Sequence, residues 1–187
     1  MPGYSLKTTG VVAMLIAMSL ASHCNGTGRV YTLGGCTWEK ETGSVQQRNG
    51  SLVLDGVAGK TELQSPLQSK NLRCEFILEF HRGLRDSSVG LETWAPDEYS
   101  ITFRGGNVKI VAGGEPKTVS PVESYIGKKI TVSLEASENR LFAKINGEVL
   151  IDEKNVYWKD RILKPRLNAD SGDMITLYSC SCSVVSP

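Results

Sequence analysis

Hydrophobic and polar residues alternate with a period of two along most of the chain after residue 36, which is the pattern of half-buried β-strands. In the clearest run, 73–81, Cys74, Phe76, Leu78 and Phe80 point to one face and the intervening residues point to the other. The same alternation recurs in four shorter runs: 99–103, 108–112, 130–134 and 141–145. We expect eight side chains from these runs to form the core: Phe76, Leu78, Phe80, Ile130, Val132, Leu134, Leu141 and Ile145.

Turn signals separate the runs. Asn49-Gly50 is one of these signals. Asn146-Gly147 suits a type I′ turn, whose central residues need positive φ, so 128–153 is predicted to be a three-stranded antiparallel meander. No stretch shows helical periodicity over three turns, and β-branched and aromatic residues fill the runs instead. The sequence therefore predicts an all-β protein, in which two packed sheets or a barrel bury the apolar faces.

The final predicted strand, 174–185, carries two cysteines two residues apart. Simple alternation puts six residues on one of its faces: Met174, Thr176, Tyr178, Cys180, Cys182 and Val184. Cys180 and Cys182 cannot easily bond to each other along a flat strand, because their Cα atoms lie near the upper limit for a disulfide and their Cβ vectors are parallel. Each is therefore expected to pair elsewhere.

The N-terminal segment has the layout of a secretory signal peptide. Lys7 precedes an apolar run, 11–21, that is shorter than the roughly 20 residues of a membrane-spanning helix, and small residues follow at the expected cleavage site. We place the cut after Ala21 and predict a signal peptide over 1–21, a leader over 22–35 and one domain over 36–187. The alternative is a buried N-terminal helix or strand. The protein is expected to be secreted and extracellular, with no membrane span.

Five cysteines fit an exported protein, but their number is odd. Cys24, next to the expected mature N-terminus, is the least constrained and is the candidate for an intermolecular disulfide. No cysteine spacing matches a zinc site. Two sequons, at Asn25 and Asn49, predict a glycoprotein.

Charge and histidine content limit the function classes. The chain has 21 Lys and Arg against 20 Asp and Glu, so it lacks the basic field that nucleic acid requires. Beyond the leader His81 is the only histidine, and its expected place is the solvated end of a strand, so a Ser-His-Asp triad has no support. The paired-acid signature Glu-x-Asp-x-x-Glu of several β-sandwich glucanases is absent from the sequence. The motifs favour binding over catalysis and leave enzymatic activity open.

Trp94 is the strongest binding candidate, because sugars stack on aromatic rings while their hydroxyls bond to carboxylates and guanidinium groups. A plain packing role is its alternative. The predicted ligand-binding residues are Glu79, His81, Glu92, Trp94, Tyr99 and Arg104. No cofactor is predicted. The loop 168–173 holds short oxygen ligands that make calcium conceivable, although a polar turn explains the same residues.

Three parts of the chain carry a resemblance to a known fold family: Trp38 followed by 45–53, 63–66 leading into 76–80, and the hairpin from 130–132 to 142–152. Over 36–185 their order resembles the concanavalin A-like jelly-roll superfamily, particularly its laminin G-like branch and the domain family named for 3-keto-disaccharide hydrolases. The resemblance implies an antiparallel two-sheet jelly-roll sandwich. Where the hydrolase-named family usually has Asn-Ser-Gly, an apolar strand and Arg, this chain has 87–93 (SSVGLET), which argues against hydrolysis.

The resemblance also implies a disulfide. Jelly rolls place the first and last strands of the domain side by side, so Cys36 is expected close to Cys180 or Cys182. Cys74 is then either the partner of the remaining C-terminal cysteine or a buried thiol, and its inward position in the alternation slightly favours the thiol.

Three functions are compatible with these features. The first is a secreted, non-catalytic concanavalin A-like module that binds glycan or an extracellular protein. The second is a glycoside-processing enzyme of the 3-keto-disaccharide hydrolase-like type that uses Glu79, Glu92 or Glu135 in a groove. The third is a structural matrix protein linked to other chains through Cys24. Convergence of two carboxylates in a concave cleft is the feature that separates the first two.

Overall fold

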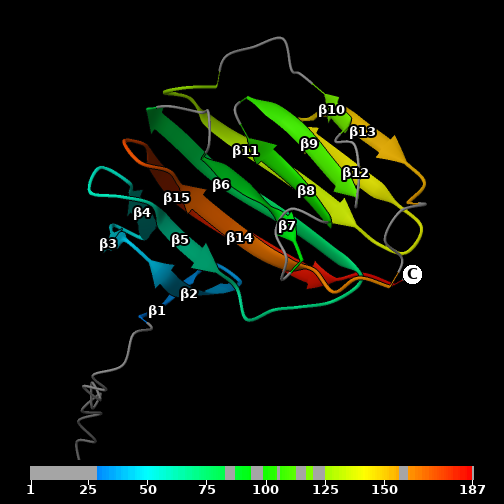
Figure 1. The fold of residues 1–187 in the computed structure, drawn as a ribbon, viewed down its shortest axis with the longest axis horizontal. Coiled ribbons are helices and arrows are strands. Elements are labelled where there is room, and N and C mark those ends of the chain that lie inside the picture. The colour runs from blue at the N-terminus through cyan, green and yellow to red at the C-terminus, as the bar shows by residue number, and fades with distance from the viewer. Residues whose placement is uncertain are drawn as a thin grey trace, which may run out of the picture.

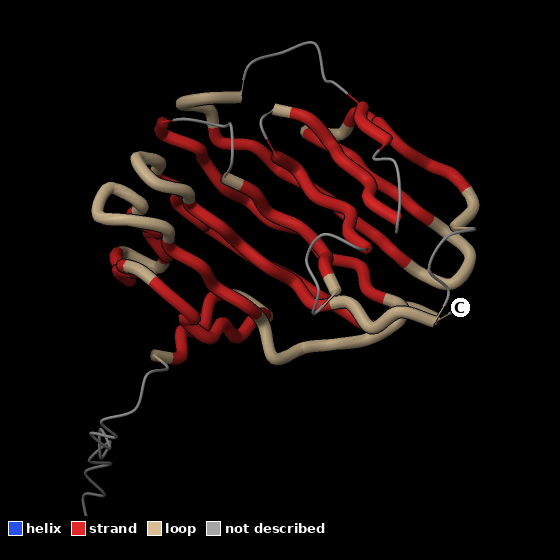
Figure 2. Tube along the Cα trace, viewed as in Figure 1, coloured by secondary structure: helices blue, strands red, loops and turns tan. Residues whose placement is uncertain are grey.

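The computed structural model describes residues 29–82, 87–93, 99–104, 106–112, 117–119, 125–155 and 160–186. These residues form two antiparallel β-sheets packed face to face, with no helix in the described part of the chain (Figures 1 and 2). The prediction of an all-β, two-sheet jelly-roll sandwich is confirmed. No helix among the described residues is long and apolar enough to cross a membrane.

The first sheet has eight strands in the spatial order β1 (Val30–Leu33), β2 (Cys36–Thr42), β5 (Thr61–Gln64), β14 (Lys164–Ala169), β7 (Ser88–Glu92), β8 (Tyr99–Arg104), β9 (Asn107–Ala112) and β10 (Lys117–Val119). The second has seven strands in the order β13 (Glu148–Glu153), β12 (Leu141–Ile145), β11 (Lys129–Ala136), β6 (Leu72–Arg82), β15 (Met174–Val184), β4 (Ser51–Asp55) and β3 (Ser44–Arg48). Strands distant in sequence are neighbours in both sheets, so neither sheet is a simple meander.

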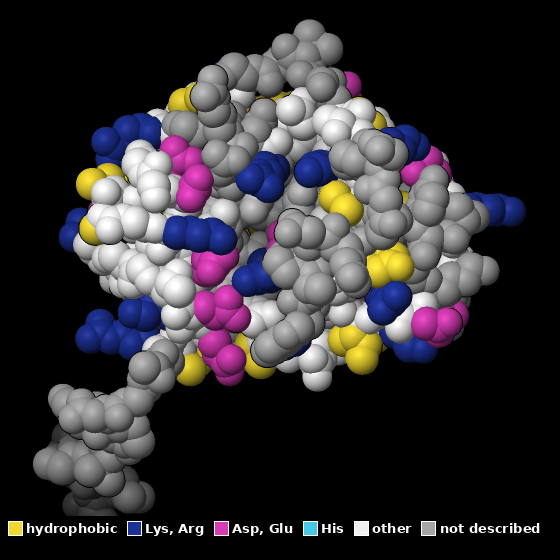
Figure 3. All heavy atoms as spheres, viewed as in Figure 1, with side chains coloured by type: hydrophobic (Ala, Val, Ile, Leu, Met, Phe, Trp, Pro, Cys, Tyr) yellow, Lys and Arg dark blue, Asp and Glu magenta, His cyan; other side chains and the backbone are white. Residues whose placement is uncertain are grey.

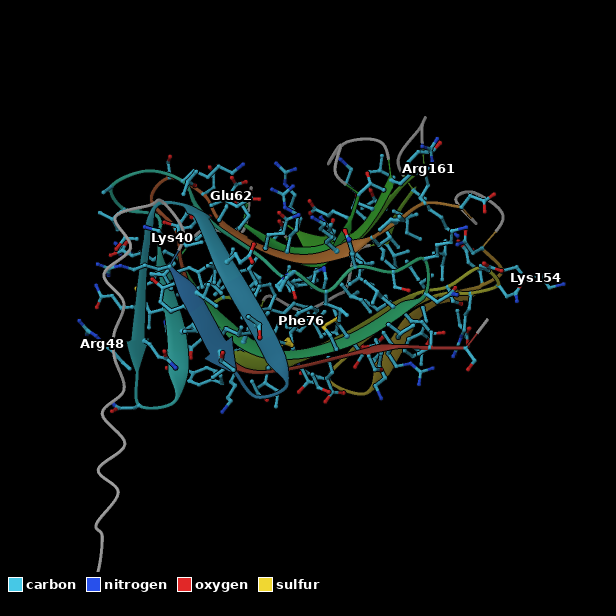
Figure 4. All side chains as sticks on the ribbon, turned by 90° about the horizontal axis from the view of Figure 1, so that it is seen from below. Lys40, Arg48, Glu62, Phe76, Lys154 and Arg161 are labelled. Carbon is cyan, nitrogen blue, oxygen red and sulfur yellow. A yellow bond between two sulfur atoms is a disulfide. The ribbon has the colours of Figure 1, made fainter. Side chains whose placement is uncertain are left out.

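The core lies between the two sheets, where apolar side chains from both inner faces meet (Figure 4). All eight residues predicted for it are buried, none exposing more than 1% of its surface. Aromatic pairs connect the layers: the ring centroids of Trp38 and Phe76 are 6.4 Å apart, and those of Phe80 and Phe103 are 5.6 Å apart. The period of two thus identified the inner face of β6, β11 and β12 correctly.

The predicted turns are present. Asn49 and Asn146 have φ values of 48° and 49°, in the left-handed region, and each is followed by a glycine with positive φ. Asn146-Gly147 joins β12 to β13, which completes the meander of β11, β12 and β13. Asn49 is exposed in the β3–β4 turn, where a sequon would be accessible, and its glycosylation stays a prediction.

The face assigned to the first half of β15 is wrong. Ile175 and Leu177 are buried, whereas Tyr178 faces outward and donates a hydrogen bond to Glu79 on the outer face of β6. The register with β6 shifts between Leu177 and Ser179, which marks a β-bulge. Because a bulge inserts one extra residue, it reverses the alternation, so Cys180 returns to the core side.

Two disulfides cross-link the domain, Cys36–Cys180 and Cys74–Cys182, with Cα–Cα distances of 5.7 and 4.1 Å. The expected proximity of Cys36 to the C-terminal cysteines is confirmed. The preference for a buried thiol at Cys74 is wrong, and the alternative, a second bridge, is correct. The cause is the bulged register of β15, which sets Cys182 directly opposite Cys74.

The sandwich begins earlier than the expected domain start at Cys36. β1 pairs with β2, and its Tyr31 and Leu33 side chains are buried in the core. The end of the predicted leader is therefore a strand of the first sheet. The predicted signal peptide 1–21 and the candidate residues Cys24, Asn25 and Trp94 lie outside the described residues.

Candidate functional site

A cavity of about 640 Å³ lies on the outer face of the eight-stranded sheet. The sheet bows so that this face is concave, with Glu62 and Arg161 toward its two raised ends (Figure 4). Six strands and the residue before β5 line the cavity with mostly polar side chains: Glu41, Lys60, Glu62, Gln64, Ser88, Glu92, Ser100, Thr102, Arg104, Lys109, Val111, Arg166 and Asn168.

Strand alternation explains this polar lining. In β14, Pro165, Leu167 and Ala169 are buried, so Arg166 and Asn168 point to the outer face. The register places Arg166, Gly90, Thr102 and Lys109 in one row across β14, β7, β8 and β9.

Gly90 leaves a gap in this row. A Cβ atom there would lie 2.4 Å from Thr102 Cγ2 and 2.9 Å from the Ile101 carbonyl oxygen. The neighbouring strand therefore approaches closely only because residue 90 has no side chain, and the Thr102 methyl group occupies the space that a side chain at residue 90 would need.

Arg166 is the centre of the charged groups in the cavity. Its Nη2 donates to Glu41 Oε2 at 3.0 Å and lies 3.8 Å from Glu62 Oε1, while its Nη1 lies 3.5 Å from Glu92 Oε2. Lys60 Nζ forms a second ion pair with Glu62 at 2.6 Å. The Arg166 and Glu92 side chains are only 15% and 13% exposed, so the cluster is largely removed from solvent.

Burial raises the pKa of Glu92 above its ordinary value of 4.5. Arg166 opposes that rise in the pKa through its positive charge, and Glu62 adds to it through like-charge repulsion. Burial, the largest of these effects, therefore favours the protonated form of Glu92.

The six predicted ligand-binding residues do not lie together in the structure. Glu92 and Arg104 line the cavity. Tyr99, at the start of β8, packs against Arg161: its hydroxyl accepts a hydrogen bond of 3.3 Å, and the guanidinium lies 4.4 Å from the ring centroid. Trp94 is among the residues that the structure does not describe.

Glu79 and His81 lie on the opposite outer face, that of the seven-stranded sheet. His81 Nε2 is 2.8 Å from Thr176 Oγ1, and its Nδ1 is 3.2 Å from Glu79 Oε1. A single site containing all six predicted residues is therefore excluded, because the alternation of β6 directs these two away from the cavity. The pair is engaged with neighbours on its own sheet, and Tyr178 donates to the second Glu79 oxygen at 2.8 Å.

Glu135 also lies in the other sheet, where it is almost fully buried. Arg73 Nε donates to its carboxylate at 2.7 Å, and Arg140 Nη1 is 3.7 Å away. These groups border a smaller cavity of about 270 Å³. Glu79 and Glu135 therefore do not share a groove with Glu92. The carboxylates that do converge near Glu92 are Glu41 and Glu62, which the sequence analysis did not single out.

The loop considered for calcium is a hydrogen-bonded turn. Asp173 accepts a hydrogen bond from the Ser87 hydroxyl, and its amide donates to the Asp170 carbonyl at 2.9 Å. The Gly56 amide donates to the Asp173 carbonyl at 2.9 Å. Within the described residues, the only converging set of three possible metal ligands is Cys36, Cys180 and Cys182, and these sulfurs are in disulfides.

The sequence did not identify several charged residues of the cavity, among them Glu41, Glu62, Lys109 and the central Arg166. One signal was present for Arg166. It is a charged residue in the middle of a short alternating segment, 164–169, which is the pattern of an outward-facing side chain in a strand.

No family model matches the chain, and no curated protein matches its sequence. Solved structures do match its fold. The CBM66 carbohydrate-binding module from Bacillus subtilis aligns at a TM-score of 0.57 and 14% identity, over 81% of this chain and 96% of the module. The Emp47p carbohydrate recognition domain aligns at 0.58 and 8% identity, over 80% and 89% of the two chains.

The Ca²⁺-bound exoplasmic/lumenal domain of VIP36 aligns at a TM-score of 0.57 and 11% identity, over 80% of this chain and 84% of that domain. The first two of these proteins are named for carbohydrate binding or recognition. At such low identities the likeness concerns the fold.

Proposed function

We propose that this protein is a secreted, non-catalytic glycan-binding module whose binding site is the cavity of the eight-stranded sheet. The observation that carries the proposal is the set of fixed polar groups on a concave sheet face, with Arg166 holding three carboxylates in place. Such groups match the hydroxyls of a sugar, because carboxylates accept and guanidinium groups donate hydrogen bonds.

The size and composition of the cavity support the same ligand class. Its volume of about 640 Å³ falls within the range of roughly 300–1,000 Å³ typical of small-ligand sites. Ser88, Ser100 and Thr102 add hydroxyl groups to the charged ones. The structural neighbours named for carbohydrate binding or recognition point the same way by analogy of fold.

Glycoside hydrolysis is the second candidate, and a specific observation favours it. Glu41, Glu62 and Glu92 converge around Arg166, and burial raises the Glu92 pKa as the acid of a carboxylate pair would require. The first candidate is preferred because the ion pairs to Arg166 and Lys60 hold all three carboxylates.

A glycan array probed with the secreted chain tests the proposal. Glu92→Gln keeps the shape of the side chain and removes its charge, so binding to the best array ligand should weaken about tenfold, the scale of one charge-assisted hydrogen bond. Glu75→Gln is the matched control, because Glu75 lies on the outer face of the other sheet. Absence of binding to every glycan, or equal losses in the two variants, would contradict the proposal.

Two further measurements separate the remaining alternatives. Release of reducing ends from the bound glycan, abolished by Glu92→Gln, would establish the hydrolase in place of the binding module. Binding that disappears with a chelator and returns with Ca²⁺ would add calcium as a partner, as in the Ca²⁺-bound form of VIP36. We expect neither result. A non-reducing gel tests separately for an intermolecular disulfide through Cys24.

A further inference from the structure

The two halves of the cavity present different charged groups among the described residues. In the half formed by β2, β5 and β14, the carboxylates Glu41 and Glu62 are matched by Arg166 and Lys60. Glu92, at the end of β7, is also paired with Arg166. Each of the three acids that line the cavity thus has a cation within 3.5 Å.

The half formed by β8 and β9 contributes positive charge. Arg104 and Lys109 line it together with the hydroxyl-bearing Ser100 and Thr102, and these two strands supply no carboxylate among the described lining residues. Arg104 also acts on Glu92 of the neighbouring strand, because its positive charge lowers the pKa of that carboxyl. Lys109 pairs with Thr102, and Arg104 with Asn107, so the two cations lie on adjacent strands. Figure 3 shows acidic side chains gathered in a band on this face, with Lys and Arg side chains beside it.

We infer that the cavity takes an acidic saccharide, whose carboxylate or sulfate group lies over Arg104 and Lys109. This inference rests on the proposed function and names its ligand class. The planar guanidinium of Arg104 matches a carboxylate or sulfate in two-point hydrogen bonding, and the Lys109 ammonium adds a point charge. Neutral hydroxyls of the same ligand then meet the carboxylates and hydroxyls of the rest of the cavity.

The experiment compares three forms of one oligosaccharide: a uronic acid tetrasaccharide, its carboxyl-reduced neutral form, and a sulfated derivative of that neutral form. Calorimetry with the intact secreted chain should give about tenfold tighter binding of an acidic form than of the neutral form, the scale of two partly exposed ion pairs. Raising the salt from 0.05 to about 1 M should reduce this ratio, because screening shortens the Debye length to about 3 Å. The acidic form that is preferred identifies the group as carboxylate or sulfate.

Two double variants test where the acidic group of the ligand binds. Arg104→Gln with Lys109→Gln should bring the acidic-to-neutral affinity ratio close to one. Arg48→Gln with Lys154→Gln removes the same charge at exposed positions toward opposite ends of the molecule (Figure 4) and should keep the ratio of the unmodified protein.

The outcomes distinguish the two proposals. Equal binding of neutral and acidic forms would overturn the acidic ligand while glycan binding stands. A preference that survives in the Arg104/Lys109 variant, or is lost equally in both double variants, would overturn the placement over β8 and β9. Failure of all three forms, together with an empty glycan array, would instead overturn the proposed function.

Discussion

Arg166 explains how three carboxylates coexist on one sheet face. Its guanidinium contacts Glu41, Glu62 and Glu92 from one position, and Lys60 assists at Glu62. A planar group with five donors can satisfy several acceptors at once, which a lysine cannot do with the same geometry. Without Arg166 the three acids would repel one another in a partly buried environment.

Replacement of Arg166 by Gln should destabilise the protein by about 2–3 kcal/mol at pH 7, because it leaves Glu92 largely buried without its main cation. The loss should shrink as the pH falls toward 4.5. A carboxyl group with a raised pKa in the folded state favours folding at pH values below its unfolded-state pKa, and this contribution is lost as the pH rises through the raised pKa. Removal of Arg166 raises the Glu92 pKa further, so the variant loses more stability than the unmodified protein at pH 7 and not at low pH.

Urea denaturation of the two proteins at several pH values measures this difference. Lys144→Gln, on the outer side of the other sheet, controls for a simple change of net charge. A destabilisation that is the same at pH 7 and pH 4.5 would mean that Arg166 acts through packing of its side chain and not through the carboxylates.

At the same scale, the sequence identified Glu92 and Arg104 as polar residues close to Trp94 but could not find their partners. Arg166 and Glu41 are 125 residues apart in the chain, and only the sheet order places their strands close together. Period-two alternation tells which face a residue takes and not which strand lies beside it. The candidate site was therefore predicted in part, and Glu79 and His81 were grouped with it although they belong to the other sheet.

At the scale of elements, regular strands were predictable and irregular ones were not. In β6 and β12 buried positions alternate strictly with less buried ones, and in β11 the apolar residues alternate with polar ones, so the inner faces of these strands follow directly from the sequence. β15 contains a bulge after Leu177, and the one inserted residue puts its two halves out of step with a single alternation. Nothing in the local pattern of Thr176 to Ser179 marks the bulge, because its register is set by pairing with β6.

Because β7 and β8 approach each other closely at Gly90, a side chain at this position should lower the stability of the sandwich. Gly90→Ala should destabilise the sandwich by about 1–3 kcal/mol, because the new Cβ would lie 2.4 Å from Thr102 Cγ2. Thr102→Ser removes that methyl group and should recover part of the loss, although the Ile101 carbonyl at 2.9 Å remains. A double-mutant cycle by thermal or urea denaturation measures the coupling, and strictly additive effects would show that the strands separate freely.

At the scale of the whole molecule, side chains of edge strands and one of the two disulfides connect the two sheets. The Tyr31 hydroxyl of β1 donates to the Val45 carbonyl of β3 at 3.3 Å, and Lys117 of β10 pairs with Glu153 of β13. β2 is bonded to β15 through Cys36–Cys180. The two-sheet sandwich and the closeness of the first and last strands were expected from the fold resemblance, since alternation alone allowed either a sandwich or a barrel.

The two disulfides form overlapping loops, which leads to a quantitative prediction. Cys36–Cys180 and Cys74–Cys182 span 144 and 108 residues, but each closes a much shorter path when the other is intact. That path runs from Cys36 to Cys74 and from Cys180 to Cys182, and is about 40 residues long for either bridge. The chain-entropy model therefore predicts the same loss, about 4 kcal/mol, on removing either bridge alone.

Paired substitutions test this equality: Cys36→Ala with Cys180→Ala, and Cys74→Ala with Cys182→Ala, each compared with the intact protein by urea denaturation. We expect losses within about 0.5 kcal/mol of each other, and a larger combined loss of about 9 kcal/mol when both bridges are removed, because the first bridge to form then closes a full-length loop. A difference above about 2 kcal/mol between the single removals would show that packing around the more deeply buried Cys36–Cys180 bridge, and not loop closure, dominates its contribution.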